Sequence, residues 1–418
     1  MIEVSAWRMR SAFLSAALVA FGSLGAAAQS TAPSAPSSPS WVGTWATAAM
    51  HDGSAASVSD LTLRQIVFTS VAGSSARIHL SNLFGTAPLR IEDVHIAQQG
   101  DRASILPATD RKVLFGGNNF VVIAPGQEAV SDPVAFSVPA RTALAISFYL
   151  PGPALRGTFH ASAHQTSYVA TGDLSGIADL PQAKPIRSTY VLTNLDVQGT
   201  ALLGSVVAFG ASITEGYNST PNANHRWPDF LAQRLVDAGI AVGVLNEGIS
   251  GNRLLVDGAG ESAEKRFDRD VLAQPGVRWV IFSDDPINDL GSTKPPPTAA
   301  ELIAGLQQLI SRAHAGHIQF FCATLTPYEG ANYWTPEGEA AREQINDFIR
   351  GGHNGCDGIV DEDTATHDPA HPTRYLPAYD SGDHLHPNDD GLKALAGAVD
   401  LALFSAAAPA NKPAGEPK

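Results

Sequence analysis

The sequence has few basic residues and no basic cluster, and this shortage excludes one class of partner. Lys and Arg number 27 against 41 Asp and Glu, which gives the 418 residues a formal net charge of −14. Because no Lys/Arg-rich run is available to neutralise phosphates, we do not expect a nucleic-acid partner. With 44% hydrophobic residues the chain can bury a sizeable core. At this length two domains with terminal tails are expected.

Long apolar runs are also scarce, and the main one lies at the N-terminus. The run AFLSAALVAFGSLG follows Arg8 and Arg10 and precedes three alanines ending at Ala28. It is too short for a permanent membrane span, and its layout is typical of a cleaved secretory signal, which we assign to 1–28. We expect a Pro/Ser linker at 29–40 and a disordered tail at 407–418. The mature protein is therefore predicted to be secreted or periplasmic, without stable membrane insertion.

Cysteine is nearly absent, which excludes a disulfide-rich scaffold. Cys322 lies in the apolar run HIQFFCATL, and Cys356 comes just before the run GIVD. In an oxidising compartment the two could pair if their strands are neighbours. Two small buried thiols are an equally ordinary outcome. The sequence leaves both outcomes open, and neither residue is assigned a catalytic role.

The periodicity of the apolar residues changes near residue 200. In 41–200, short alternating runs such as LTLRQIVFTS and ALAISFYLPGP are separated by turn residues, which predicts an all-β sandwich. No internal repeat suggests a propeller or a solenoid. In 201–406, strand-like apolar runs alternate with helical segments, which predicts a parallel sheet in a doubly wound α/β domain.

Polar residues follow the predicted parallel strands where each strand ends, and in such sheets ligands bind beyond these ends. They include Ser212 in GASITEG, Gly251 in NEGISGN, Asn288 in DDPIND, and Asp383 and His386 in DHLHP. A nucleophilic hydrolase needs a hydroxyl, a base, an orienting carboxylate and oxyanion donors, and all four types are present. The small residues at 210 and 211 are expected to leave room for a substrate carbonyl.

These four blocks resemble, in order, those of the SGNH hydrolases, also called GDSL esterases. The likeness covers Gly204 to about Phe404, and the β half, which opens with WVGTWATA, resembles the sandwich that precedes this domain in one subgroup of secreted members. The resemblance implies a flavodoxin-like three-layer α/β/α domain after a jelly-roll-like β-sandwich. It also implies hydrolysis of an ester through an acyl-enzyme, without a metal or an organic cofactor.

The resemblance assigns a role to each residue of the site. Ser212 would be the nucleophile, His386 the general base and then acid, and Asp383 the carboxylate that orients the imidazole. The backbone N–H groups of Ser212 and Gly251 and the side-chain amide of Asn288 would form the oxyanion hole. Loss of one such donor typically costs about 3 kcal/mol of transition-state stabilisation.

Two positions depart from the family pattern. Ala211 stands where the family usually has aspartate, so hydrogen bonds that brace the nucleophile turn are expected to be missing. Pro286 stands where glycine is usual, and a proline biases the preceding Asp285 toward extended backbone. We therefore expect Asn288 to be presented on a stiffer loop of altered course, in a weakened or specialised esterase.

Other residues admit alternative interpretations. His384 and His386 form an H-x-H beside Asp383, which could be part of a metal site, but a metal needs three or four ligands and no matching second cluster is present. Tyr328 and Trp334, in TLTPYEGANYWTPEGE, are candidates for lining an acyl or sugar site. Aromatic residues in loops often serve only to anchor the loop.

The sequence therefore predicts a secreted serine esterase acting on a small-molecule or glycan ester. The acyl group is expected to be short, acetyl included, because no long apolar segment suggests a fatty-acid tunnel or a lid. Two alternatives remain: a glycan-binding protein whose SGNH domain has lost turnover, and a hydrolase of lipids or thioesters. The oligomeric state is not predicted.

Overall fold

The computed structural model describes residues 41–53, 57–152, 154–155 and 157–404. The predicted signal peptide at 1–28, the linker at 29–40 and the tail at 407–418 lie outside these residues. Within the described part, no helix is both long enough and apolar enough to cross a membrane.

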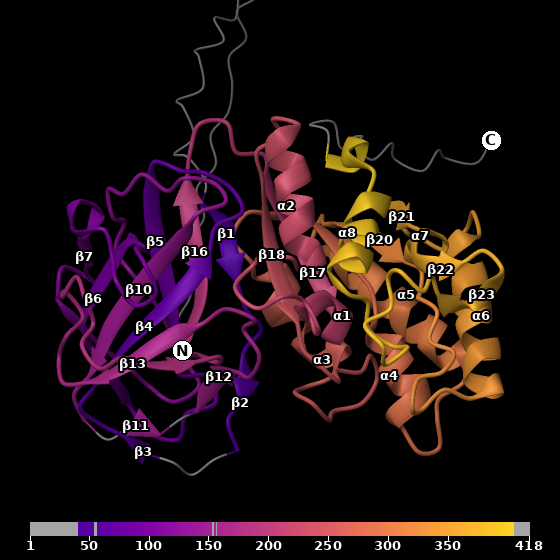
Figure 1. Ribbon diagram of the computed structural model, residues 1–418, viewed down its shortest axis with the longest axis horizontal. Helices are drawn as coiled ribbons and strands as arrows, with labels where there is room; N and C mark the ends of the chain where they lie inside the picture. Colours follow the sequence, from indigo (N-terminus) through magenta and orange to yellow (C-terminus); the bar gives the residue numbers. More distant parts are fainter. Residues whose placement is uncertain (1–40, 54–56, 153, 156, 405–418) are drawn as a thin grey trace, which may run out of the picture. The chain divides into compact units, whose positions relative to one another are not determined.

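Two antiparallel sheets form the first half of the described chain, as predicted (Figure 1). One sheet has the strand order β1-β16-β5-β9 and the other β14-β13-β4-β10-β6-β7, with β8 paired to β6. The strands of the first sheet are β1 (Val42–Ala46), β16 (Leu192–Gln198), β5 (Ser75–Ser81) and β9 (Glu128–Val130). Those of the second are β14 (Lys184–Ile186), β13 (Ser167–Thr171), β4 (Leu61–Phe68), β10 (Ala143–Leu150), β6 (Leu89–Gln98), β7 (Arg111–Val113) and β8 (Phe120–Ile123).

The two sheets share one apolar core, because successive side chains of a strand point to opposite faces. In β5, for example, Ile78 and Leu80 are buried and pack with Ile146 and Phe148 of β10 in the other sheet. Short strand pairs flank the sandwich: β2 (Met50–His51), β12 (Thr158–His160) and β15 (Thr189–Tyr190) form one sheet, and β3 (Ser57–Val58) pairs with β11 (Ala154–Leu155). A β-sandwich is thus confirmed.

A five-stranded parallel sheet follows, in the order β18-β17-β19-β20-β21. Numbered along the chain, this is the order 2-1-3-4-5 of the flavodoxin-like folds. The strands are β17 (Gly204–Gly210), β18 (Val242–Gly248), β19 (Val277–Phe282), β20 (Gln319–Ala323) and β21 (Gly358–Val360). Every residue of β17 is buried, as expected of a central strand covered on both faces.

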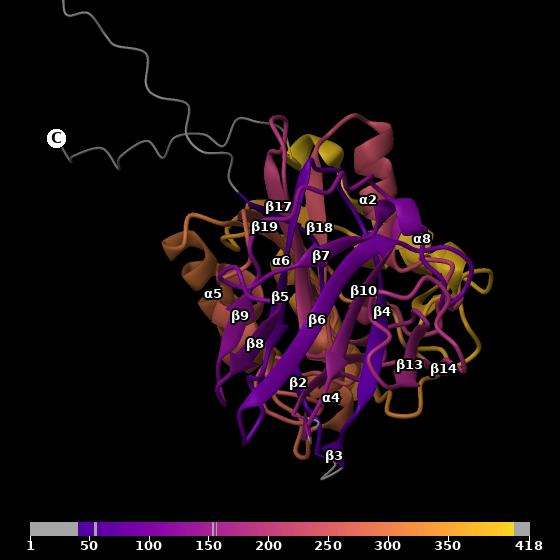
Figure 2. The same ribbon diagram turned by 90° about the vertical axis from the view of Figure 1, so that its left-hand side faces the viewer.

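Helices cover both faces of this sheet, which confirms the predicted doubly wound domain (Figure 2). α2 and α8 pack against each other, whereas α5 packs against α3 and α6. The helices are α1 (Ser212–Glu215), α2 (Trp227–Asp237), α3 (Ala263–Phe267), α4 (Asp285–Ser292), α5 (Ala299–Ala315), α6 (Pro336–Arg350), α7 (Glu362–Thr366) and α8 (Asp389–Ala398). A π-helical turn at Asp268–Leu272 continues α3, short 3-10 turns lie at Pro107–Thr109 and Leu401–Phe404, and β22 (His367–Asp368) pairs with β23 (His371–Tyr375).

The β half and the α/β half meet where β1 packs against β18. The backbones approach so closely that a Cβ on Gly243 would lie 1.9 Å from the carbonyl oxygen of Gly43, so glycine is required there. The hydroxyl of Ser70 accepts a hydrogen bond from the backbone N–H of Val244 at 2.8 Å. The contact between the halves therefore involves the backbone of the parallel sheet itself.

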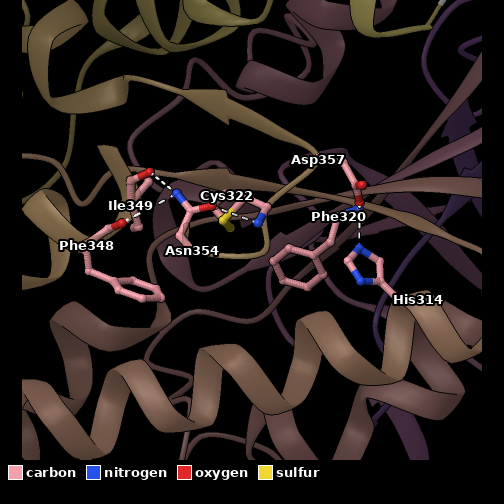
Figure 3. Close-up of a disulfide and its surroundings, with 8 residues drawn as sticks. His314, Phe320, Cys322, Phe348, Ile349, Asn354 and Asp357 are labelled. Atoms are coloured by element: carbon pink, nitrogen blue, oxygen red, sulfur yellow. Dashed lines mark hydrogen bonds and ion pairs between the residues drawn. A yellow bond between two sulfur atoms is a disulfide. The ribbon is translucent and has the colours of Figure 1, made fainter. Parts of the chain in front are cut away.

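The two cysteines form a disulfide (Figure 3). Cys322 lies on β20 and Cys356 just before the neighbouring β21, and their Cα atoms are 5.8 Å apart. Asn354 holds the same loop by accepting from the N–H of Cys356 at 2.9 Å, and Asp357 accepts from the N–H of Phe320 at 2.7 Å. Of the two outcomes that the sequence left open, the structure has the disulfide.

Candidate active site

Ser212 lies at the point where β17 ends and α1 begins. The strand is buried, the turn at Ala211 departs from extended geometry (φ −105°, ψ −135°), and Ser212 is the first helical residue. The serine is 7% exposed, so its hydroxyl lies near the surface of a buried turn.

Asp284 braces the nucleophile turn. Its Oδ1 accepts from the N–H of Ala211 at 2.9 Å and from the hydroxyl of Thr214 at 2.7 Å, and its Oδ2 accepts from the N–H of Ile213 at 2.7 Å. Charged acceptors of this kind form strong hydrogen bonds. The expectation that Ala211 leaves the turn without bracing was wrong, because the carboxylate comes from the end of the neighbouring strand β19.

Gly210 is needed for this bracing. A Cβ there would lie 2.3 Å from Oγ1 of Thr214 and 2.5 Å from Oδ1 of Asp284. The absence of a side chain at Gly210 therefore makes room for the bracing carboxylate, and the expected room for a substrate carbonyl stays a prediction. Ala211 is likewise fully buried.

The structure brings the three predicted catalytic side chains together. Nε2 of His386 lies 2.8 Å from Oγ of Ser212, and Nδ1 of His386 lies 2.7 Å from Oδ2 of Asp383. Because a carboxylate only accepts, Nδ1 carries the proton and Nε2 presents its lone pair to the serine hydroxyl. Nucleophile, base and orienting carboxylate thus have the geometry required for serine activation.

Asp383 is kept ionised by its surroundings although burial favours its neutral form. Hydrogen bonds from the ring and the backbone N–H of His386 (2.8 Å) and from the N–H of Leu385 (3.0 Å) outweigh burial and lower the pKa of Asp383. Its side chain is 42% exposed. The ring of Tyr217 packs on His386 with the ring centres 4.4 Å apart. The carboxylate is therefore available as an anion at neutral pH.

The predicted oxyanion residues Asn288, on α4, and Gly251, on the loop after β18, lie on segments that are tied to each other. Nδ2 of Asn288 donates to the carbonyl of Asn252 at 2.9 Å, which uses one of its two N–H groups. The hydroxyl of Tyr333 donates to Oδ1 of Asn288 at 3.0 Å and fixes the orientation of the amide. Gly251 has φ +78°, a left-handed conformation that favours glycine. Among the described residues the second N–H of Asn288 has no partner, so it is available for an oxyanion.

The same loop is held by Asp289, the other half of the Asn-Asp pair. Its carboxylate accepts from the N–H groups of Leu254 at 2.6 Å and Leu255 at 3.3 Å. Burial raises the pKa of Asp289 to about 6, against the opposing effect of these two N–H groups. Asp289 thus anchors the segment that follows Gly251.

Pro286 does not place Asn288 on a loop. Asp285 and Pro286 form the first turn of α4, and Asn288 and Asp289 are helical residues. Proline is favoured in the first helical turn because its missing N–H has no intrahelical partner there and its fixed φ suits a helix. The predicted extended Asp285 was therefore wrong, and the asparagine is presented from a helix.

Arg266 of α3 is fully buried. Together with Asp284 and Asp285 it forms a buried layer that we call the floor of the site. Its guanidinium donates to the carbonyl of Gly210 at 2.9 Å, to the carbonyl of Glu247 at 2.6 Å and to Oδ1 of Asn252 at 3.0 Å. It also bonds Oδ2 of Asp270 at 3.2 Å. One side chain thus connects the end of β17, the end of β18 and the oxyanion loop.

Asp285 is a second buried group of the floor, and its pKa is higher than that of an ordinary aspartate. Neither of its carboxylate oxygens has a hydrogen-bond partner among the described residues, and Nη2 of Arg266 is 3.9 Å from Oδ1. Burial raises the pKa of Asp285 to about 8; Arg266 opposes this rise, and the charges of Asp284 and Asp289 reinforce it. Asp285 is therefore largely neutral at pH 7.

Of the two aromatic residues predicted to line a substrate site, Tyr328 does not do so, whereas for the partly buried Trp334 this stays a prediction. Tyr328 is 1% exposed and belongs to the apolar core, and Nε1 of Trp334 donates to Glu339 at 3.3 Å, beside that core. The aromatics that contact the site are instead Tyr217, on the imidazole, and Tyr333, on the amide. Tyr217 directly follows the serine block, which is the only sequence signal that could have indicated it.

His384 is separate from the serine-histidine pair. Its Nδ1 lies 2.5 Å from Oδ2 of Asp380, and 53% of its side chain is exposed. Among the described residues, no group of three or more His, Cys, Asp or Glu side chains is arranged to hold a metal ion.

A comparison with family models gives one match, over part of the chain. Residues 208–394 match the model of the GDSL-like lipase/acylhydrolase family, a segment that contains Ser212, Asn288, Asp383 and His386. No curated protein matches the chain. Similar solved structures include an alpha/beta hydrolase enzyme from the metagenome of Lake Arreo, Spain (22% identity, 50% of this chain and 97% of that one, TM-score 0.37). Others are an acetylxylan esterase from Geobacillus stearothermophilus (21%, 48% and 93%, 0.37) and a GDSL-like lipase from Bacteroides thetaiotaomicron VPI-5482 (18%, 48% and 87%, 0.37).

Proposed function

We propose that this protein, whose residues 208–394 are a domain of the GDSL-like lipase/acylhydrolase family, hydrolyses carboxylic esters through an acyl-enzyme on Ser212. The observation that carries the proposal is the continuous chain from Oγ of Ser212 through both ring nitrogens of His386 to Asp383, at 2.8 and 2.7 Å. Each contact has the donor and acceptor order that serine activation needs.

The reaction proceeds in two halves. Oγ of Ser212 bonds to the ester carbon while its proton passes to Nε2 of His386, and the carbonyl electron pair moves onto the oxygen. The N–H groups of Ser212 and Gly251 and the free N–H of Asn288 stabilise this oxyanion. Collapse breaks the bond to the alcohol, which leaves with the proton from His386. Water then repeats the sequence on the acyl-enzyme and releases the acid.

We further propose that the acyl group is short and that the protein acts outside the cytoplasm. The proposal of a short acyl group rests on the lack of a long apolar segment that could form a tunnel or lid. The N-terminal signal pattern supports export. The disulfide between Cys322 and Cys356 is consistent with an oxidising compartment. An acetylated carbohydrate is the natural ester we would test first.

The test uses the mature protein with nitrophenyl esters of increasing acyl length and an organophosphonate label. We expect hydrolysis of the acetyl ester, a rate that falls from butyryl to octanoyl, and a label on Ser212. A faster octanoyl rate would favour a lipid hydrolase. A folded protein that neither hydrolyses the esters nor takes the label would favour the glycan-binding alternative.

A further inference from the structure

Glu215 is a buried charge that the proposed reaction does not use. It is the last residue of α1, three positions after the nucleophile, and is only 3% exposed. Its two carboxylate oxygens contact the oxyanion loop on one side and the β half on the other. A buried carboxylate is costly unless its oxygens are paired, so each partner has to be identified.

Toward the catalytic half, Glu215 holds Ser250. Its Oε1 accepts from the N–H of Ser250 at 3.2 Å, and its Oε2 accepts from the hydroxyl of the same residue. Ser250 immediately precedes Gly251, and the peptide that joins them carries the N–H proposed as an oxyanion donor. Because Gly251 is free to rotate more than other residues, an anchor on the preceding residue fixes the direction of that N–H.

Toward the β half, Glu215 faces two histidines. Nε2 of His160, on β12, lies 3.2 Å from Oε1, and Nε2 of His164 lies 3.6 Å from Oε2. Nδ1 of His160 is 3.0 Å from the carbonyl of Ala48, which can only accept, so Nδ1 donates. Nε2 faces a carboxylate and must carry a second proton for the contact to be attractive.

The electrostatics of Glu215 agree with this arrangement. Burial raises the pKa of Glu215, but His160 and His164, together with the hydroxyl of Ser250, lower it to about 2. Glu215 is therefore an anion at neutral pH, and the groups that lower its pKa include His160 and His164 of the β half.

An arginine beside Glu215 has a different carboxylate partner. Arg226 lines the small cavity around Glu215 but is committed to Asp229, with Nε 2.6 Å from Oδ2 and Nη2 3.0 Å from Oδ1. Among the described residues, the ion-pair contacts of Glu215 are those with His160 and His164.

We propose that Glu215 is a positioning residue that fixes the Ser250–Gly251 peptide, and that His160 and His164 hold Glu215 in place, so that the β-sandwich completes the oxyanion hole. The part of this inference that concerns rate rests on the proposed function. The part that concerns loop order does not, because it depends only on the contacts of Glu215.

The experiment compares Glu215→Gln and His160→Gln with the wild type. Glutamine keeps the shape of Glu215 but loses its charge. We expect faster amide hydrogen exchange in 249–252, a kcat for nitrophenyl acetate lowered about tenfold or more, and a KM within about twofold, because an oxyanion donor acts mainly in the transition state. His95→Gln is the control: it removes a comparable ion pair with Asp110 inside the β half and should change neither quantity.

The outcomes separate this inference from the proposed function. Wild-type exchange in 249–252 together with wild-type kcat in both variants would overturn the inference and leave the esterase proposal intact. If the wild type is inactive and unlabelled, the proposed function fails, and the exchange rates alone decide whether Glu215 orders the loop. Should His160→Gln fail to fold, His164→Gln provides the same comparison at a longer contact.

Discussion

The rim and the floor of the candidate site differ in solvent access and in what their hydrogen bonds connect. The rim (Ser212, Asp383 and His386) consists of side chains bonded to one another, and Asp383 is 42% exposed. The floor (Asp284, Asp285 and Arg266) is buried. Asp284 bonds the backbone of the nucleophile turn, and Arg266 bonds the backbone at the ends of β17 and β18. The rim is built to exchange protons, whereas the floor is built to hold loops. Changes in the rim should therefore alter rate, and changes in the floor should alter stability.

The largest expected effect separates the rim from the floor. Ser212→Ala should lower kcat for a nitrophenyl ester by about 10³-fold or more, because the nucleophile is lost. Its thermal midpoint should stay at the wild-type value or rise, since the serine hydroxyl makes no contact with the floor. Steady-state kinetics and a circular dichroism melt measure the two quantities. Undiminished hydrolysis would show that another group is the nucleophile.

A substitution in the floor should show the opposite pattern. Arg266→Met removes a donor from Oδ1 of Asn252 and from the carbonyls of Gly210 and Glu247. Asp270 keeps its pair with Arg269, so the expected cost is that of buried acceptors that lose a donor, about 1–3 kcal/mol of the free energy of unfolding. Urea unfolding followed by fluorescence measures it. Arg374→Met is the matched control, because it removes an exposed ion pair with Glu329 and should leave the midpoint unchanged. Equal midpoints for the two variants would contradict the structural role of the floor.

The smallest expected effect is a change in pH dependence. An unfolded aspartate releases its proton near 3.8, but folded Asp285 holds it to about pH 8. Between these values the folded state binds more protons, so the free energy of unfolding falls as the pH rises. Asp285→Asn should weaken this pH dependence. We expect the difference in Tm between pH 5 and pH 8 to become smaller by a few degrees. An unchanged slope would show that Asp285 is not protonated in the folded state.

The rim could be predicted from the sequence, because each of its residues occupies a recognisable place. Ser212 follows a run of β-formers, and the spacing of Asp383 and His386 before the last helix is a local pattern. Parallel strands bring such positions to one edge of the sheet. Local pattern and topology together were sufficient.

The floor could not be predicted in the same way. Ala211 suggested that the bracing carboxylate is missing, because the family usually has aspartate immediately before the nucleophile. The bracing carboxylate is at Asp284, more than seventy residues later, and reaches the turn only because β19 lies beside β17. Pro286 was interpreted through its effect on the preceding residue, and the helix that begins there outweighed that effect.

The contacts between the two halves also could not be predicted from the sequence. His160 lies on a three-residue strand, and nothing in its neighbourhood indicates a partner 55 positions away. For Cys322 and Cys356, neighbouring strands were predicted, but neighbouring strands do not decide between a bond and two thiols. Tyr328 lies in the kind of loop sequence in which an aromatic residue can be either exposed or buried. Only the structure shows that its side chain packs in the core.

The bracing by Asp284 has a consequence for the order in which the nucleophile becomes competent during synthesis. A nascent chain that has emerged only as far as β18 contains the serine, yet the acid that shapes its turn has not been made. The nucleophile turn can take its final shape only once β19 has packed against β17. His386 is synthesised later still, with the last loop. Hydrolytic competence is thus tied to completion of the sheet, so partly made chains carry an inert serine.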